Sequence, residues 1–152
     1  MTENQIVQGC IAGSVHCQKQ LYIQFAPKMM AICMRYSASV EEAEDMLQEA
    51  FIRVFSKIDT FKQDGPLGAW VRRVVVNTAA EVYRKDKKHN LNRDVEDHLY
   101  GMYSRDYIIE HLAANDLMAV VRQLPEGYRV VFNLYAIEGY SHKEIGDMLS
   151  IS

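Results

Sequence analysis

The sequence has little cysteine and no long apolar run. Its three cysteines are Cys10, Cys17 and Cys33. They cannot all pair within the chain and lack close metal-ligand spacing, so we expect reduced thiols packed as small hydrophobic groups. No apolar run approaches the roughly 20 residues that cross a bilayer, and the N-terminus lacks the basic-then-apolar order of a signal peptide. The sequence therefore predicts a cytoplasmic protein without membrane insertion.

Sequence motifs of catalysis are also missing. There is no P-loop and no G-x-S-x-G, and none of the five histidines follows a glutamate at the Glu-x-x-His spacing of di-iron bundles. No nucleophile lies beside an evident base. These absences predict a protein that is not an enzyme and that uses no cofactor and no metal.

The net charge of -3 is distributed unevenly. Residues 61–93 carry eight basic and three acidic side chains, whereas residues 94–120 carry one basic and six acidic side chains. A basic block of this length in an acidic protein indicates a nucleic-acid-binding segment. The alternative is an ordinary solvated charged face.

Apolar residues recur at helical spacing almost throughout, with no alternating strand pattern and no internal repeat, so we expect an all-α fold. Pro27 should kink or interrupt the second helix because it lacks an amide donor. Polar residues from His89 to about Glu110 indicate a linker with some helix. The predicted helices cover residues 6–13, 19–36, 40–58, 67–87, 115–124, 126–137 and 141–149.

The helix over residues 40–58 has two distinct faces. Ser39 and Glu42 form an S-x-x-E capping box at its start. Its apolar face comprises Val40, Ala43, Leu47, Ala50, Val54 and Ile58, with Phe51 and Phe55 beside it. The opposite face carries Asp45, Gln48, Glu49 and Ile52, at the spacing of a helix that docks against a partner helix. A merely solvated face is the alternative.

The helix over residues 67–87 carries a mostly polar stripe next to an Asp64-Gly65-Pro66 loop. Cations can hold phosphates, an amide can read base edges and aromatic rings can stack on unpaired bases. Alternatively, the tryptophan belongs to the core. The stripe comprises Trp70, Arg73, Asn77, Glu81 and Arg84, flanked by Arg72.

The last segment, GYSHKEIGDMLSIS, has the layout of the first helix and turn of a helix-turn-helix. Ser141 and Glu144 form a second capping box, and Gly146 is small where two crossing helices must approach closely. The recognition helix would follow Ser152, so we expect a chain truncated within the motif. A small α-hairpin is the competing interpretation.

Taken in order, four segments resemble the signature of ECF (extracytoplasmic function) RNA polymerase sigma factors. The most specific feature is D-x-x-Q-E-x-F followed about twenty residues later by W-x-x-R-x-x-x-N-x-A. The resemblance covers most of the chain. The segments are LYIQFAPKMMAICMRY, EEAEDMLQEAFIRVFSKIDTF, LGAWVRRVVVNTAAEVYRK and LPEGYRVVFNLYAIEGYSHKEIGDML.

The resemblance implies a transcription initiation factor with two small helical domains: sigma region 2 in residues 1–93, a linker in 94–113, and a partial sigma region 4 in 114–152. Asp45, Gln48, Glu49 and Ile52 would then bind the clamp helices of the largest subunit of core RNA polymerase. Residues of the loop and the following helix would recognise and melt the minus-ten promoter DNA: Phe61, Lys62, Asp64, Trp70, Arg72, Arg73, Asn77 and Arg84.

Ser141, His142 and Lys143 would be the partial minus-thirty-five DNA-binding motif. Ser150 replaces the glycine often found in the turn of that motif, where a left-handed backbone is favoured. The family also implies control by an anti-sigma factor. Two alternatives stay open on the sequence: a helix-turn-helix regulator that acts without polymerase, and a helical interaction or adaptor protein.

Overall fold

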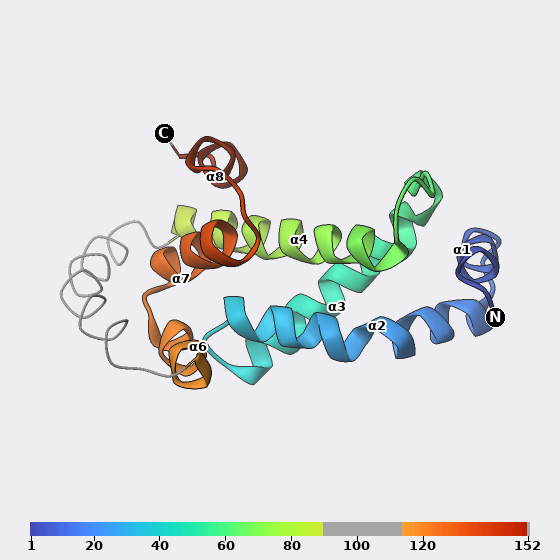
Figure 1. The fold of residues 1–152 in the computed structure, drawn as a ribbon, viewed down its shortest axis with the longest axis horizontal. Coiled ribbons are helices and arrows are strands. Elements are labelled where there is room, and N and C mark those ends of the chain that lie inside the picture. The colour runs from blue at the N-terminus through green and yellow to red at the C-terminus, as the bar shows by residue number, and fades with distance from the viewer. Residues whose placement is uncertain (90–113, 152) are drawn as a thin grey trace.

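The computed structural model describes residues 1–89 and 114–151, and in these residues the regular elements are all helical (Figure 1). The linker predicted at 94–113 lies outside them. The N-terminal bundle, residues 1–89, contains α1 (Glu3–Ile11), α2 (Val15–Tyr36), α3 (Val40–Lys57), a 3₁₀ turn (Ile58–Thr60) and α4 (Leu67–His89). The C-terminal unit, residues 114–151, contains α6 (Ala114–Gln123), α7 (Glu126–Phe132), a π turn (Asn133–Ile137) and α8 (His142–Leu149).

Local capping sets where the first helices begin. The Thr2 hydroxyl accepts from the Gln5 amide while the Gln5 side chain accepts from the Thr2 amide, so α1 begins three residues earlier than predicted. Ser14 caps α2 at Cys17, and Ser39 caps α3 at Glu42. The Glu42 carboxylate reaches the amide of Ala38 instead of Ser39, so the predicted capping box is shifted by one residue.

Helix α2 runs through Pro27, so of the predicted kink or interruption the interruption is absent. Pro27 and Ile23, whose carbonyl loses its usual amide partner, are both exposed, so water can replace that hydrogen bond. The buried residues of α2, among them Leu21 and Phe25, lie on the other side of the helix. The missing backbone hydrogen bond at Pro27 therefore lies on the solvent side of α2 and not in the core.

Helices α2, α3 and α4 pack around one apolar core. The predicted apolar face of α3 is buried except for Val40, which is exposed. At the edge between α3 and α4, the Arg53 guanidinium contacts Glu81 at 2.6 Å and Glu49 at 3.1 Å. Lys85 lies 3.3 Å from the second oxygen of Glu81. These ion pairs join the two helices that carry most of the predicted site residues.

The C-terminal unit packs directly on the N-terminal bundle. Helices α7 and α8 contact α4, and α6 and α7 contact the end of α2 (Figure 1). Val130, Leu134, Ile145 and Leu149 are buried in the same apolar cluster as the core of the bundle. Ile145 and Leu149 therefore point from α8 into the core.

Two buried polar side chains tie the C-terminal unit to the end of α2. Nε of Arg129 donates to the carbonyl of Tyr36 at 2.8 Å, and Nη1 donates to the carbonyl of Leu124 at 2.8 Å. Nδ2 of Asn133 donates to the carbonyl of Arg35 at 3.0 Å. These bonds compensate the desolvation that lowers the pKa of Arg129.

The C-terminal end of α8 is tight. Ser150 has φ of 57°, the left-handed conformation expected at this turn, and its amide donates to the carbonyl of Asp147. Gly146 has a close backbone neighbour that leaves no room for a side chain. A Cβ there would lie 2.8 Å from the carbonyl oxygen of Ile151, so the close neighbour is the following turn of the same chain.

Replacing Ser150 with glycine should stabilise the protein. Left-handed backbone costs a residue with a Cβ on the order of 1 kcal/mol, and glycine avoids this cost. Urea unfolding of Ser150→Gly should therefore give a free energy of unfolding about 0.5–1 kcal/mol above wild type. The same change at Ser56, which is exposed inside α3, should lower it by a similar amount. Equal effects at both positions would contradict the left-handed conformation of Ser150.

Glu81 should make folding acid-sensitive. Hydrogen bonding to Arg53 lowers the pKa of Glu81 from 4.5 to about 2. A depressed carboxyl pKa stabilises the fold above pH 4.5, and this stabilisation is lost as the pH falls toward 2. As the pH falls across this range, the free energy of unfolding should decrease less steeply for Glu81→Gln than for wild type. The control Glu44→Gln, exposed on α3, should keep the wild-type slope, and an unchanged slope for Glu81→Gln would refute the role.

Candidate functional site

The predicted partner-binding face of α3 is open. Asp45, Gln48, Glu49 and Ile52 are exposed, and 70% of Ile52 is accessible. Packing of the opposite face against the core, through Leu47 and Val54, holds the polar face outward. A large apolar side chain surrounded by polar groups is typical of a protein contact surface.

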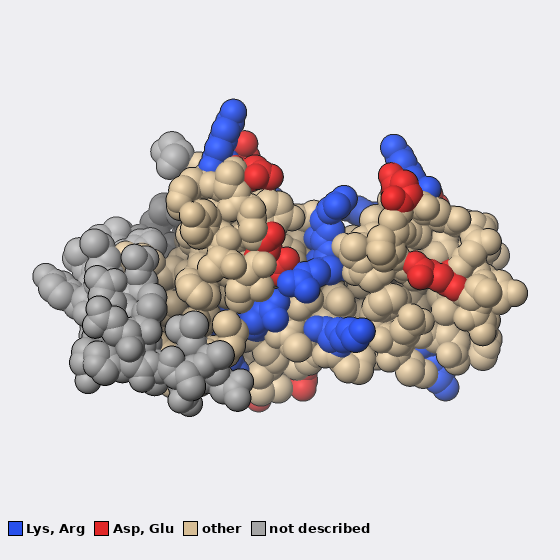
Figure 2. Space-filling model, in the orientation of Figure 1, with Lys and Arg blue, Asp and Glu red and all other residues tan. Residues whose placement is uncertain are grey.

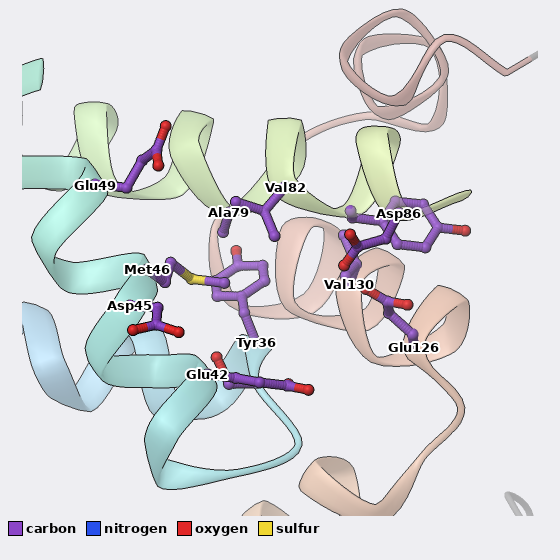
Figure 3. A pocket seen from close by; sticks show the side chains of 12 residues that line it. Tyr36, Glu42, Asp45, Met46, Glu49, Ala79, Val82, Asp86, Glu126 and Val130 are labelled. Atoms are coloured by element: carbon purple, nitrogen blue, oxygen red, sulfur yellow. The ribbon is translucent and has the colours of Figure 1, made fainter. Parts of the chain in front are cut away.

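An acidic hollow of about 210 Å³ lies beside this face, between α3, α4 and α7 (Figure 3). Tyr36 and Met46 lie in its middle (Figure 3). None of the described residues that line it is Lys or Arg. Its carboxylates are Glu42, Asp45 and Glu49 from α3, Asp86 from α4 and Glu126 from α7. The hollow and the α3 face together favour a cationic partner.

The loop before α4 carries an aromatic pair. The ring centroids of Phe61 and Trp70 are 5.6 Å apart at 46°, and both side chains are half-buried against the core. Lys62 and Asp64 are exposed beside them. Trp70 therefore belongs partly to the core and partly to the surface, and its position combines the two interpretations of the sequence.

Helix α4 presents Arg73 and Asn77 to solvent, one turn apart and one turn after Trp70. The arrangement offers a cation, an amide and an aromatic edge in one row. Glu81 belongs to the ion-pair cluster of Arg53. The polar stripe predicted on α4 is thus divided between an open part and a structural part.

The C-terminal unit contacts the other two arginines predicted to bind DNA. Arg72 makes a bidentate pair with Glu138, with Nη2 to Oε1 at 2.7 Å and Nε to Oε2 at 3.0 Å. Nη1 of Arg84 donates to the carbonyl of Met148 at 3.3 Å. The hydrogen bond to Glu138 raises the pKa of Arg72. Both arginines bind groups of the chain itself in this arrangement.

The predicted residues of the partial minus-thirty-five motif lie at the start of α8, all exposed. The Ser141 hydroxyl accepts from the amide of Glu144, and the Glu144 carboxylate accepts from the amide of Ser141. His142 stacks on Tyr135, with ring centroids 4.5 Å apart. Lys143 follows His142 in the sequence. The capping box fixes the backbone at the N-terminal end of α8, and so sets the orientation of these exposed residues.

Basic side chains gather on the face of the molecule that Figure 2 shows. Lys and Arg lie across the middle of this face, with Asp and Glu side chains next to them (Figure 2). Basic residues of α4 include Arg72, Arg73, Arg84 and Lys85. The charge asymmetry seen in the sequence therefore becomes a local basic surface.

Sequence reasoning missed Arg35 and Glu138. Glu138 lies directly before Gly139 and is nearly buried, with 10% of its side chain exposed. Its Oε1 lies 3.6 Å from Nη2 of Arg35 as well as 2.7 Å from Arg72. Burial and the nearby Glu138 raise the pKa of Tyr36, which lies in the same cluster. No local pattern indicates partners this far apart in the sequence.

In the part of the chain that the structure describes, no cluster of His, Cys, Asp and Glu has the arrangement of a metal site. Within the same residues, no helix combines the length and the apolar character needed to cross a membrane.

Comparisons with known proteins place both parts of the chain. Residues 21–89 match the family described as Sigma-70 region 2, and residues 114–152 match Sigma-70, region 4. The chain is 30% identical to the ECF RNA polymerase sigma factor SigW of Bacillus subtilis, over 84% of this chain and 74% of that protein. It is 22% identical to the RNA polymerase sigma-H factor of Pseudomonas aeruginosa, over 97% of this chain and 82% of that protein.

A third relative is longer. The ECF RNA polymerase sigma factor SigE of Mycolicibacterium smegmatis is 30% identical over 87% of this chain, which spans 52% of that protein. Sigma factors are not a class of catalysts, and the two matched regions stand in the predicted order on the predicted helices. The chain therefore belongs to the ECF family of sigma factors and is a transcription initiation factor.

Proposed function

We propose that this sigma factor binds core RNA polymerase through the exposed face of α3, with Asp45, Gln48, Glu49 and Ile52 against the clamp helices of the largest subunit. The observation that carries the proposal is the exposure of Ile52, 70% accessible, on a helix whose other face is buried. Carboxylates around it favour a basic partner helix, and a central apolar side chain supplies burial.

The second surface is proposed to bind minus-ten promoter DNA. Arg73 and Asn77 are exposed on α4, after the Phe61–Trp70 pair. Unstacking a base costs a few kcal/mol, so a site that melts DNA needs aromatic and hydrogen-bonding groups to replace the lost stacking. Lys62 and Asp64, in the loop before α4, belong to the same surface. Arg72 and Arg84 become part of it when the C-terminal unit moves away from α4.

The domain roles follow from these surfaces. Residues 1–93 are proposed to bind polymerase and the minus-ten element, residues 94–113 to link the domains, and residues 114–152 to form the partial region 4. Ser141, His142 and Lys143, exposed at the start of α8, are proposed to contact DNA at the minus-thirty-five element. An amide-rich helix start beside a cation suits phosphate contacts.

An anti-sigma factor is proposed as a further partner, acting in the cytoplasm where polymerase works. The acidic hollow adjoins the polymerase-binding face and is lined by both parts of the chain. A basic segment bound there would contact Asp45 and Glu49 and compete with polymerase. This placement is supported by charge complementarity.

Replacing Gln48 and Ile52 together with alanine should weaken polymerase binding at least tenfold, because central interface residues each contribute on the order of 1–2 kcal/mol. Gel filtration with core RNA polymerase measures this as loss of co-elution. The control pair Gln20→Ala with Gln24→Ala changes α2 instead. Co-elution of the Gln48/Ile52 variant at wild-type levels would contradict the α3 assignment.

Replacing Arg73 and Asn77 together with alanine should spare co-elution with polymerase. It should weaken binding of a fluorescein-labelled single-stranded oligonucleotide of mixed sequence by about thirtyfold, since each of the two lost contacts contributes about 1 kcal/mol. Fluorescence anisotropy at several salt concentrations measures it. Salt-independent or absent binding by wild type would instead favour an adaptor that does not contact DNA.

A further inference from the structure

The contact between Glu138 and the two arginines of the N-terminal bundle has an imbalance of charge. Arg35 and Arg72 together carry two positive charges, and Glu138 supplies one negative charge to both. Both guanidinium groups approach the same oxygen, Oε1, at 3.6 Å and 2.7 Å. The carboxylate satisfies Arg72 by a bidentate pair and leaves Arg35 with a charge contact alone.

The hydrogen-bond donors of Arg35 are also incompletely used. Its Nε and Nη2 are buried and have no hydrogen-bond partner. Burying a charged donor without an acceptor costs free energy, so such groups usually have a functional or structural reason. A larger anion than a carboxylate would reach donors that Glu138 does not satisfy.

The position of this pair relates it to DNA. Arg72 precedes Arg73 on α4 and flanks the row of Trp70, Arg73 and Asn77, and 41% of the Arg72 side chain is exposed, so the site has an open edge. Guanidinium groups bind phosphates and carboxylates through the same bidentate geometry. A carboxylate bound there can therefore stand in for a phosphate of the nucleic-acid backbone.

We infer that Arg35 and Arg72 form a binding site for a promoter DNA phosphate, and that Glu138 fills this site while the C-terminal unit is docked. The inference rests on the proposed DNA-binding role of α4. Docking and DNA binding then compete for the same two guanidinium groups. Arg84, bound to the carbonyl of Met148, becomes available in the same movement.

Because of this competition, the docked C-terminal unit inhibits DNA binding by the N-terminal bundle of the same chain. A ligand shifts such an equilibrium only by its difference in affinity for the two states. Polymerase that separates the two parts of the chain would remove Glu138 from the site and expose Arg35, Arg72 and Arg84 together. The free sigma factor would then bind single-stranded DNA more weakly than its α4 surface allows.

The test uses the full chain and the labelled oligonucleotide of mixed sequence. Glu138→Gln keeps the shape of the side chain and removes its charge. It should bind the oligonucleotide at least fivefold more tightly than wild type. Its logarithmic salt dependence should equal that of wild type, because both complexes neutralise the same phosphate once Glu138 has left the site. Adding Arg35→Gln to this variant should weaken binding again and make the salt dependence shallower by about 0.7, the value for one phosphate fewer neutralised on a single strand.

Asp147→Asn is the matched control, because it removes the same charge from an exposed position on α8 of the same unit. It should change affinity less than twofold. Equal affinities for Glu138→Gln and Asp147→Asn would overturn the inference. In that case, a loss of binding in the Arg73/Asn77 variant would show that the proposed function still holds.

A second variant covers the case in which Glu138→Gln fails to fold, as judged by circular dichroism. Arg35→Gln alone leaves the bidentate pair of Arg72 and Glu138 in place. It should make the salt dependence of DNA binding shallower by about 0.7. An unchanged slope would exclude Arg35 from the phosphate site. Absence of DNA binding by every variant, wild type included, would remove the proposed function and this inference together.

Discussion

The arrangement of the two parts of this sigma factor depends on one nearly buried carboxylate. Glu138 has 10% of its side chain exposed, and removing a charge from water is costly unless opposite charges and hydrogen bonds replace the solvent. Arg72 supplies two hydrogen bonds and Arg35 a further charge. Without these partners the carboxylate would favour a solvated position, and the C-terminal unit could not keep Glu138 against α4.

Apolar burial supplies most of the free energy that holds the C-terminal unit on the bundle. The ion cluster and the hydrogen bonds determine the exact position of that unit. Val130, Leu134, Ile145 and Leu149 complete the core of the bundle, and such contacts are not directional. The bonds of Arg129 to the Tyr36 carbonyl and of Asn133 to the Arg35 carbonyl are directional, and both end on the last turn of α2. Together with Glu138 they fix one position of the C-terminal unit on α2 and α4.

The two proposed binding surfaces share the same core. Packing of Leu47 and Val54 turns the polymerase-binding face of α3 outward, while packing of Val71 and Val75 leaves Arg73 and Asn77 exposed on α4. The Arg53–Glu81 pair links these helices at their common edge. A change that disturbs the core would therefore affect both surfaces, whereas the polar residues can be changed separately.

Local patterns predicted most of the helices, because periodicity, capping residues and turn residues act over a few positions. The bounds of α3, the start of α4 and the left-handed Ser150 follow from such patterns. The exposed faces of α3 and α4 could also be predicted. The capture of Arg72 by Glu138 could not, because the partners are 66 residues apart and their meeting depends on tertiary packing. The continuity of α2 through Pro27 could not be predicted either, since the exposure of Pro27 is also a tertiary property.

The position of the C-terminal unit on α4 depends most on direct coupling between Arg72 and Glu138. A double-mutant cycle measures it, with Arg72→Gln, Glu138→Gln and the double variant compared with wild type by urea unfolding. Because the carboxylate is nearly buried and bound through two atoms, we expect a coupling free energy of about 1 kcal/mol or more. Additive effects, with coupling below about 0.3 kcal/mol, would show that the pair does not hold the C-terminal unit in place.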